Sequence, residues 1–465
     1  MTDLLIVGGD VVTMDSARRV LTGATVAVSG DSIAALGTAE DLRARFPGAR
    51  EIDASGCVVI PGLIDAHQHT TVDPLVRSMI PDHIGSQESI FDWIVPLHAH
   101  ADGDDDELAA TITAVECLSR GITTVLEPGT VAYPERVAAG LGAAGIRARV
   151  GGWGWDADGV PFGAPADEVL ARQEDIVRSL PVTGPVTGWV TLVGHDLASD
   201  ELFAGAASLA ERLDTGLTWH ISPGPADVEA YALRCARRPV VHFRELGVLG
   251  PRLLLGHAVW LDDAEVDAIL ETRTAVAACP GAYLRLAQGY TRASRHAELV
   301  RRGGRVALGC DAHNAGDAPD VLLAAYLFAG LERDRDLPDP VRAEQAFALA
   351  TIDGARAIGL GGRIGSLEVG KAADIVVLDA RDPAWTPRGD LARQLVWGHV
   401  SRTVRDVLVD GRVVVRDRRP TGVDLAAVAA AAAERSAALL RRAGIAPRPT
   451  WPTESAGHLA KETTR

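Results

Sequence analysis

Residues 58–69 read VVIPGLIDAHQH, an apolar run that ends in a His-x-His pair. Side chains alternate between the two faces of a strand, so His67 and His69 point to the same side, with Cα atoms about 6.6 Å apart. Two neutral imidazoles at one strand end can bind one divalent metal ion. A lone pair of this kind is more commonly two solvated side chains, so the metal-site hypothesis requires further ligands elsewhere in the chain.

Short apolar runs alternate with helical stretches after this segment. The pattern of eight strand-helix units predicts an α/β protein built on a parallel (β/α)8 TIM barrel. Barrels of this kind place their chemistry at the carboxyl ends of the strands. The expected strands are residues 58–64, 122–126, 147–152, 188–193, 216–221, 252–257, 274–279 and 305–309, and the clearest helices are 105–120, 167–179, 200–213, 262–271 and 319–333.

Both ends of the chain have a different pattern, with short strands and turns but few long helices. Strand-like runs occupy residues 4–7, 11–14 and 25–28, and return at 375–378, 404–408 and 413–415. Asp410-Gly411 is typical of a hairpin turn. We therefore expect a small β-sandwich domain built from both ends. The expected division is 1–56 and 363–420 for that domain, 57–362 for the barrel, and 421–465 for a helix (424–442) and a tail.

Composition excludes several classes of partner. The net charge of -16 argues against nucleic acid and anionic membranes, which require basic patches. No run approaches the roughly 18 apolar residues that span a bilayer. The five cysteines are scattered, so neither a disulfide framework nor a thiolate zinc site is indicated. The N-terminal segment lacks the features of a signal peptide, and we expect a cytoplasmic enzyme with a small-molecule substrate.

Three further polar residues follow predicted strands. His220 ends the fifth strand, His257 ends the sixth and Asp311 follows the eighth. A lone histidine at such a position is usually structural, and a lone aspartate usually caps a helix. In a closed barrel, however, these three side chains face one crevice together with His67 and His69. The five together predict a metal site.

These motifs resemble the amidohydrolase superfamily, in the branch of chlorotriazine hydrolases and of cytosine, guanine and adenosine-type deaminases. The resemblance implies that His67, His69, His220 and Asp311 bind the metal ion and that His257 lies beside the bound water or the substrate. It extends from residue 4 to about residue 417. The segments that carry it are 10–14, 61–69, 121–125, 256–257, 308–311, 350–356 and 365–374.

The chemistry suits these residue types. A metal ion with one open position lowers the pKa of a bound water to about 7. Asp311 can then accept the water proton and pass it to the leaving group, while His257 stabilises the developing oxyanion. Binuclear members of the superfamily are bridged by a carbamylated lysine, a glutamate or a cysteine at the third or fourth strand end, but Lys371 and Lys461 lie outside the barrel strands and the fourth strand carries no acid or thiol. We expect one divalent ion, Zn²⁺, with Fe²⁺, Mn²⁺ or Co²⁺ as alternatives.

The chain departs from the deaminase pattern at two strands. Deaminases of this branch carry His-x-x-Glu at the fifth strand, where this chain has Pro223. The seventh strand ends in Ala278-Cys279-Pro280, without the histidine of many relatives. Both changes favour hydrolysis of an amide, urea, carbamate or thiocarbamate bond in a small apolar molecule, as in the phenylurea and molinate hydrolases.

Two alternatives remain open. The protein could be a deaminase or chlorohydrolase of an N-heteroaromatic ring, in which His195, Glu127 or His313 replaces the missing glutamate, or a scaffold without activity. Relatives often form dimers or tetramers, so we expect a homo-oligomer. The candidate substrate contacts are His195, Tyr283, Trp155, His313 and Glu127.

Overall fold

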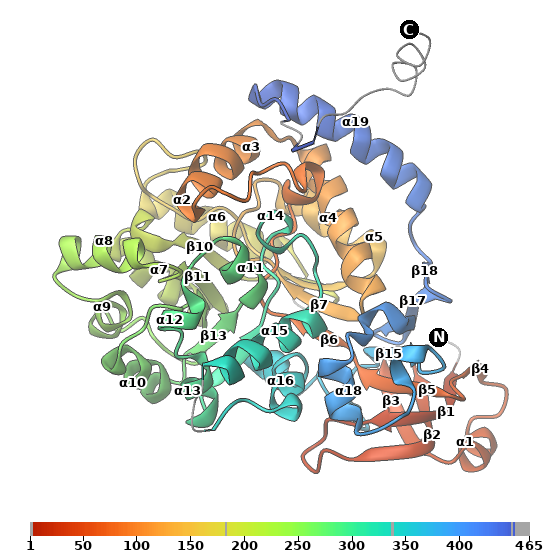
Figure 1. Ribbon diagram of the computed structural model, residues 1–465. Coiled ribbons are helices and arrows are strands. Elements are labelled where there is room, and N and C mark those ends of the chain that lie inside the picture. Colours follow the sequence, from red (N-terminus) through yellow and green to blue (C-terminus); the bar gives the residue numbers. More distant parts are fainter. Residues whose placement is uncertain (1–2, 182–183, 336–338, 448–449, 452–465) are drawn as a thin grey trace, which may run out of the picture.

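A barrel of parallel strands stands beside a sheet made from both ends of the chain (Figure 1). This computed structural model describes residues 3–181, 184–335, 339–447 and 450–451, so much of the predicted tail lies outside the described residues. The predicted α/β class and the TIM barrel are both confirmed.

The barrel closes through hydrogen bonds at two seams. Trp189 lies between β9 and β10; its backbone amide donates to the Val150 carbonyl (2.9 Å) on one side, while the next amide, of Val190, donates to the Gly216 carbonyl (3.1 Å) on the other, so that this segment joins the two halves of the barrel. At the other seam, the Asp311 amide donates to the His67 carbonyl (2.8 Å). The strands are β6 (Leu63–Asp65), β7 (Ile122–Leu126), β8 (Arg147–Val150), β9 (Val186–Gly188), β10 (Val190–Gly194), β11 (Leu217–Ile221), β12 (Leu253–His257), β13 (Ala275–Ala278) and β14 (Arg305–Leu308).

Helices surround the barrel and follow most of its strands. The five helices predicted above correspond to α4, α6, α7, α10 and α15, with ends that differ by no more than two residues. The barrel helices are α4 (Gly103–Ser119), α5 (Pro134–Ala144), α6 (Ala166–Ser179), α7 (Asp200–Arg212), α8 (Pro225–Cys235), α9 (Pro239–Glu245), α10 (Asp263–Thr272), α11 (Pro280–Arg285), α12 (Tyr290–Ala293), α13 (His296–Arg301), α14 (His313–Gly316), α15 (Val321–Asp334), α16 (Ala343–Leu349) and α17 (Ile352–Ala357).

The predicted small β-domain is built from both ends of the chain, as expected, and its nine strands form one hydrogen-bonded sheet. Its order is β18-β17-β16-β15-β5-β1-β2-β3, with β4 beside β1. The strands are β1 (Leu4–Val12), β2 (Val20–Ser29), β3 (Ser32–Gly37), β4 (Arg50–Asp53), β5 (Cys57–Pro61), β15 (Ile375–Asp379), β16 (Val404–Val409), β17 (Arg412–Arg416) and β18 (Arg419–Pro420), and α1 (Ala39–Arg45) and α18 (Leu391–Trp397) lie in the same parts of the chain.

The apolar run that leads to the His-x-His pair is divided between the two sheets. It was expected to form one barrel strand, but β5 pairs with β1 and β15 in the nine-stranded sheet and only β6 enters the barrel. Gly62 lies between them, where an added Cβ would come 2.0 Å from the Thr123 hydroxyl oxygen. Any larger residue there would push β5 away from the barrel.

Buried contacts join the sheet to the barrel. Val58 and Ile60 of β5 pack into the same large core as the barrel helices, while Val59 packs within the nine-stranded sheet. Arg147 of β8 donates to Asp374 (2.9 Å) and to Asp410 (2.6 Å) of the C-terminal segment. The sheet is therefore fixed against the amino end of the barrel by apolar packing and by a buried ion-pair network.

The connection from β6 to α4 crosses the open end of the barrel. It contains η1 (Asp73–Val76), α2 (Ser86–Glu88), the π-helix η2 (Ser89–Ile94) and α3 (Val95–His100). The C-terminal helix α19 (Leu425–Ala443) packs over this connection and α4 (Figure 1), and buries Leu439 and Leu440 there. Within the described residues, no helix has the length and hydropathy needed to cross a membrane.

Candidate metal centre and active site

The five residues predicted to share a crevice do meet at the carboxyl end of the barrel. His67 and His69 follow β6, His220 lies in β11, His257 ends β12 and Asp311 follows β14. Nε2 of His69 lies 3.3 Å from Nε2 of His220 and 3.3 Å from Oδ1 of Asp311. Nε2 of His67 lies 3.8 Å from the same carboxylate oxygen.

These separations fit a tetrahedral ion. Ligand atoms about 2.0–2.1 Å from zinc in a tetrahedral site lie roughly 3.3–3.4 Å from one another. The contacts of His69 with His220 and with Asp311 have that spacing, and the 3.8 Å contact between His67 and Asp311 is somewhat longer. Both ring nitrogens of His67 are buried and have no hydrogen-bond partner among the described residues. A buried polar atom without a partner is costly, so an ion that binds Nε2 would remove part of this cost.

The remaining ring nitrogens are held by the protein. Nδ1 of His220 lies 2.8 Å from the Val193 carbonyl oxygen, which makes Nδ1 the protonated nitrogen. Nδ1 of His69 lies 2.8 Å from the Thr130 hydroxyl, which in turn lies 2.7 Å from Glu127 Oε1. Such partners fix the tautomer with Nε2 free and orient the ring toward a metal ion.

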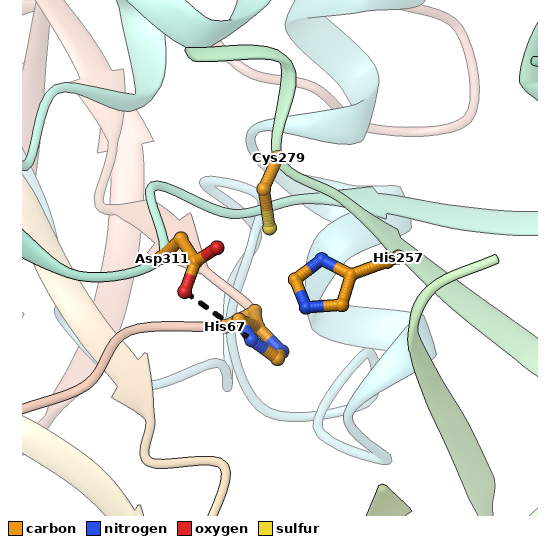
Figure 2. A group of neighbouring side chains, drawn as sticks. All are labelled: His67, His257, Cys279 and Asp311. Atoms are coloured by element: carbon orange, nitrogen blue, oxygen red, sulfur yellow. Dashed lines mark ion pairs between the residues drawn. The ribbon is translucent and has the colours of Figure 1, made fainter. Parts of the chain in front are cut away.

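A second group of possible ligands overlaps the first. His67, His257, Cys279 and Asp311 each offer a ligand atom within 4.8 Å of the others, and Figure 2 shows the four side chains converging. Burial raises the pKa of the Cys279 thiol well above its ordinary value. The thiol is therefore a poor ligand compared with the imidazoles unless a cation displaces its proton.

Burial and the neighbouring carboxylates set the charge of the histidines. It lowers the pKa values of His67 and His220 well below the ordinary value and that of His257 to about 4. Burial alone would raise the pKa of Asp311, but its hydrogen bond with His69 and the neighbouring imidazoles outweigh this and lower it. Burial would also lower the pKa of His69, but the hydrogen bond with Asp311 and the charge of that carboxylate outweigh it and raise the pKa. Near neutral pH His67, His220 and His257 are therefore uncharged and Asp311 is a carboxylate, whereas a metal ion that binds His69 displaces a proton shared with Asp311.

Two site residues adopt backbone conformations that are costly for residues with a side chain. His257 has φ 71° and Asp311 has φ 68°. Left-handed conformations of this kind cost of order 1 kcal/mol or more and persist where the surrounding structure enforces them. At both strand ends the conformation turns the chain sharply at the crevice.

A cavity of about 360 Å³ opens beside these ligands. Its lining includes His69, His220, His257 and Asp311, and otherwise it is mainly apolar. The β6–α4 connection covers one side, and no lysine or arginine of the described chain is among the lining residues. The apolar lining residues are Ile90, Phe91, Ile94, Val95, Trp153, Trp155, Val193, Leu197, Pro223, Ala226, Ala230, Leu286, Ala312 and Ala315.

Two of the five predicted substrate contacts line this cavity. Trp155 stacks on Trp153, with ring centroids 4.8 Å apart, and forms part of the apolar wall. His195 lies in the turn after β10, and its ring stacks on that of His220 at 5.6 Å. Both positions are compatible with substrate contact.

The structure places the other three away from the cavity. Tyr283 is buried and points its hydroxyl toward backbone carbonyls of His257 and Ala277. His313 is buried and pairs with Glu116 at 3.2 Å. Glu127 is fully buried behind Thr130, where it also accepts from the Gly129 amide. These three side chains were expected to contact a ligand, but they lie outside the cavity lining.

Sequence reasoning gave no role to three residues that the structure brings to the site. Cys279 directly follows β13, the seventh barrel strand. The rule that the carboxyl ends of barrel strands face the site, which identified His257, could have identified Cys279 too. Thr130 contacts His69 from the loop after β7. Asp227 lies in the first turn of α8 and contacts His195 (3.1 Å) across a separation of 32 residues, which no sequence pattern indicates.

Comparison with known proteins agrees with this geometry. The profile of the "Amidohydrolase family" matches residues 58–414, and a bacterial "Imidazolonepropionase-like composite domain" matches residues 26–49. A 5-methylthioadenosine/S-adenosylhomocysteine deaminase of Syntrophobacter fumaroxidans is 34% identical over 418 residues, which cover 90% of this chain and 94% of the relative. An S-triazine hydrolase of Gordonia rubripertincta is 28% identical over 97% of this chain and 99% of its own length.

A solved structure is similar over nearly the whole fold. An adenosine deaminase of Xanthomonas campestris, solved with bound zinc, superposes with a TM-score of 0.88 at 28% identity and covers 94% of this chain and 98% of its own. The predicted membership, the metal dependence and the enzyme class, a hydrolase of non-peptide C–N bonds, are confirmed. The chain belongs to the amidohydrolase family, in the branch that includes methylthioadenosine/S-adenosylhomocysteine deaminases and triazine hydrolases.

Proposed function

We propose that this enzyme hydrolyses an amino or halogen substituent from a carbon atom of a small, neutral N-heteroaromatic ring. The relatives named above favour this alternative over the amide or urea cleavage that Pro223 suggested from sequence, because their names describe adenine-ring deaminases and a triazine hydrolase. The observation that carries the proposal is that three of the proposed ligands, His69, His220 and Asp311, line a mainly apolar cavity.

The cavity supports a limited class of substrate. Its volume of about 360 Å³ is at the lower end of the range for ligand pockets and suits one or two fused rings with short substituents. Away from the metal site, a phosphate or carboxylate group buried there would meet no lysine or arginine of the described residues, which costs several kcal/mol. The stacked rings of Trp153 and Trp155 offer an apolar surface to alkyl or aryl substituents.

The proposed metal set is one zinc ion held by His67, His69, His220 and Asp311. A zinc ion at this site would supply a water of lowered pKa and polarise the substrate. Asp311 would take a proton from the attacking water and return it to the departing group. His257, buried between the ligands and the cavity, would hold the new oxygen substituent by a hydrogen bond.

A substrate panel tests the proposal. Zinc-loaded protein is assayed with aminopurines, amino- and chlorotriazines and aminopyrimidines, and separately with anilides, phenylureas and thiocarbamates. We expect release of ammonia or chloride from neutral ring substrates and none from the Asp311→Asn variant. Turnover of the amides or ureas, with no reaction of any ring substrate, would instead establish the acyl hydrolase expected from sequence.

A further inference from the structure

Hydrolysis at a ring carbon requires a proton donor that the ligand set does not supply. When water adds to a C=N carbon, the bond's electron pair moves onto the ring nitrogen, which must be protonated for the addition to proceed. Asp311 is occupied with the proton of the attacking water. At position 223, which lines the cavity after β11, the chain has a proline that can donate no proton.

Most other titratable groups at the cavity are already engaged. Asp196 pairs with Arg234 at 2.8 Å. Asp73 accepts from the Asn314 amide at 3.1 Å, and His98, beside Asp73, packs against Trp153. Burial lowers the pKa of His98 to about 3, so it carries no transferable positive charge near neutral pH.

His195 differs from these groups. Its Nδ1 lies 3.1 Å from Asp227 Oδ1, while Nε2 has no hydrogen-bond partner among the described residues. The ring stacks on that of His220 with an interplanar angle of 22°, and it lines the cavity together with Pro223 and Asp227. His195 therefore has one nitrogen fixed by the protein and the other free beside the metal site.

Helix α8 holds this histidine at two points. Asp227 binds the ring, and Tyr231, one turn later on the same helix face, donates from its hydroxyl to the His195 carbonyl at 2.6 Å. Asp227 also accepts from the Ser222 amide through Oδ2, so its carboxylate bridges the ends of β10 and β11. His195 has φ 53°, a conformation that this double anchorage can enforce.

We propose that His195, oriented by Asp227, is the acid that protonates the ring nitrogen of the substrate. The inference rests on the proposed function. As the water oxygen bonds to the ring carbon, His195 gives its Nε2 proton to the adjacent ring nitrogen. The C–N bond to the amino group then breaks as that group takes the proton held by Asp311 and leaves as ammonia. The hydroxyl proton of the adduct returns to His195, which leaves a ring carbonyl beside an N–H group.

In this account His195 is a catalytic residue and Asp227 is a positioning residue. The geometry also restricts the substrate, because a ring nitrogen must lie next to the carbon that is attacked and on the side of β10. Amides and ureas need no such donor. His195 and Asp227 should therefore be required for the hydrolysis of ring substrates and not for that of amides or ureas.

Steady-state kinetics of four variants test the proposal on a ring substrate that the wild type converts. His195→Phe keeps the ring stacked on His220 but removes the proton, and we expect kcat to fall by about 10²- to 10⁴-fold, the usual contribution of a general acid. Asp227→Asn should lower kcat by about 10- to 100-fold, with partial recovery in Asp227→Glu. Glu229→Gln, on the exposed face of α8, is the matched control and should match the wild type.

The readouts separate the possible failures. KM within about threefold of wild type, with unchanged zinc content and thermal unfolding, is expected for both low-activity variants. If His195→Phe raises KM at constant kcat, or both variants retain normal kcat, the proposal is overturned while ring hydrolysis stands. A loss of zinc in Asp227→Asn would also overturn it, by showing that the pair only supports the metal ligands. If the wild type converts no ring substrate, the proposed function fails and the inference falls with it.

Discussion

Replacing Thr130 by valine tests how the protein orients its metal ligands. The Thr130 hydroxyl accepts from Nδ1 of His69 (2.8 Å) and donates to Oε1 of Glu127 (2.7 Å). Valine has nearly the same shape but has no hydroxyl, so Thr130→Val removes both hydrogen bonds. The next acceptor for His69 Nδ1 is Glu127 Oε1, which is 3.8 Å away and too far for a hydrogen bond.

The expected size of the effect follows from this geometry. Glu127 retains the backbone amides of Gly129 (2.7 Å) and Thr130 (3.1 Å), so the carboxylate stays in place. His69 loses the only hydrogen-bond partner that its Nδ1 has among the described residues, and a lost partner of a buried group costs about 1–3 kcal/mol. Because the ring position affects zinc directly, we expect zinc affinity to fall 10- to 100-fold, or about 1.4–2.7 kcal/mol.

Competition with a chelator of known affinity measures this change without reference to activity. Thr130→Ser keeps the hydroxyl and should bind zinc within about threefold of the wild type. Circular dichroism confirms that each variant is folded. Zinc binding by Thr130→Val within twofold of the wild type, or an equal loss in both variants, would refute the argument that this hydroxyl orients His69.

Three further outcomes are expected. Asp311→Asn should lower kcat at least about 10³-fold, because the substitution removes both a metal ligand and the proton carrier. The unfolding free energy in urea should stay near that of the wild type, and near-normal turnover would exclude both roles of Asp311. Burial lowers the pKa of His98 to about 3, so below about pH 6.5 the unfolded chain takes up a proton at this residue while the folded chain does not. Between pH 7 and pH 5 the unfolding free energy of the wild type should therefore fall by about 2 kcal/mol more than that of His98→Gln. An equal pH dependence of urea unfolding in both proteins would contradict this. Leu439→Ala opens a cavity under α19 and should lower the unfolding free energy by about 2–4 kcal/mol, whereas a change below about 1 kcal/mol would show that α19 packs weakly.

The convergence of the five side chains could be predicted from sequence because it depends on local rules. Each of His67, His69, His220, His257 and Asp311 ends or follows an apolar run, and strand direction alone brings the carboxyl ends of a barrel together. The same rule does not give the direction of a side chain in the loops beyond the strands. Glu127 and His313 lie at the same rim but turn away from the cavity, toward Thr130 and Glu116.

Other features depend on packing between segments that are distant in sequence. The apolar run 57–61 reads like a barrel strand, but its partners in β1 and β15 are selected by tertiary contacts that periodicity does not reveal. The contact of Asp227 with His195 likewise depends on how α8 docks against the turn after β10. The missing glutamate and His195, as one candidate to replace it, were therefore visible in the sequence, while the contact with Asp227 was not.

Titration of zinc into stripped protein tests the central claim most directly. Hydrolysis of a neutral ring substrate should be lost below about 0.1 equivalent of metal and should return in proportion to added zinc, with saturation at one equivalent per chain. Activity that persists in the stripped protein would contradict metal-dependent ring hydrolysis at His67, His69, His220 and Asp311. Saturation at two equivalents would contradict the single-ion site.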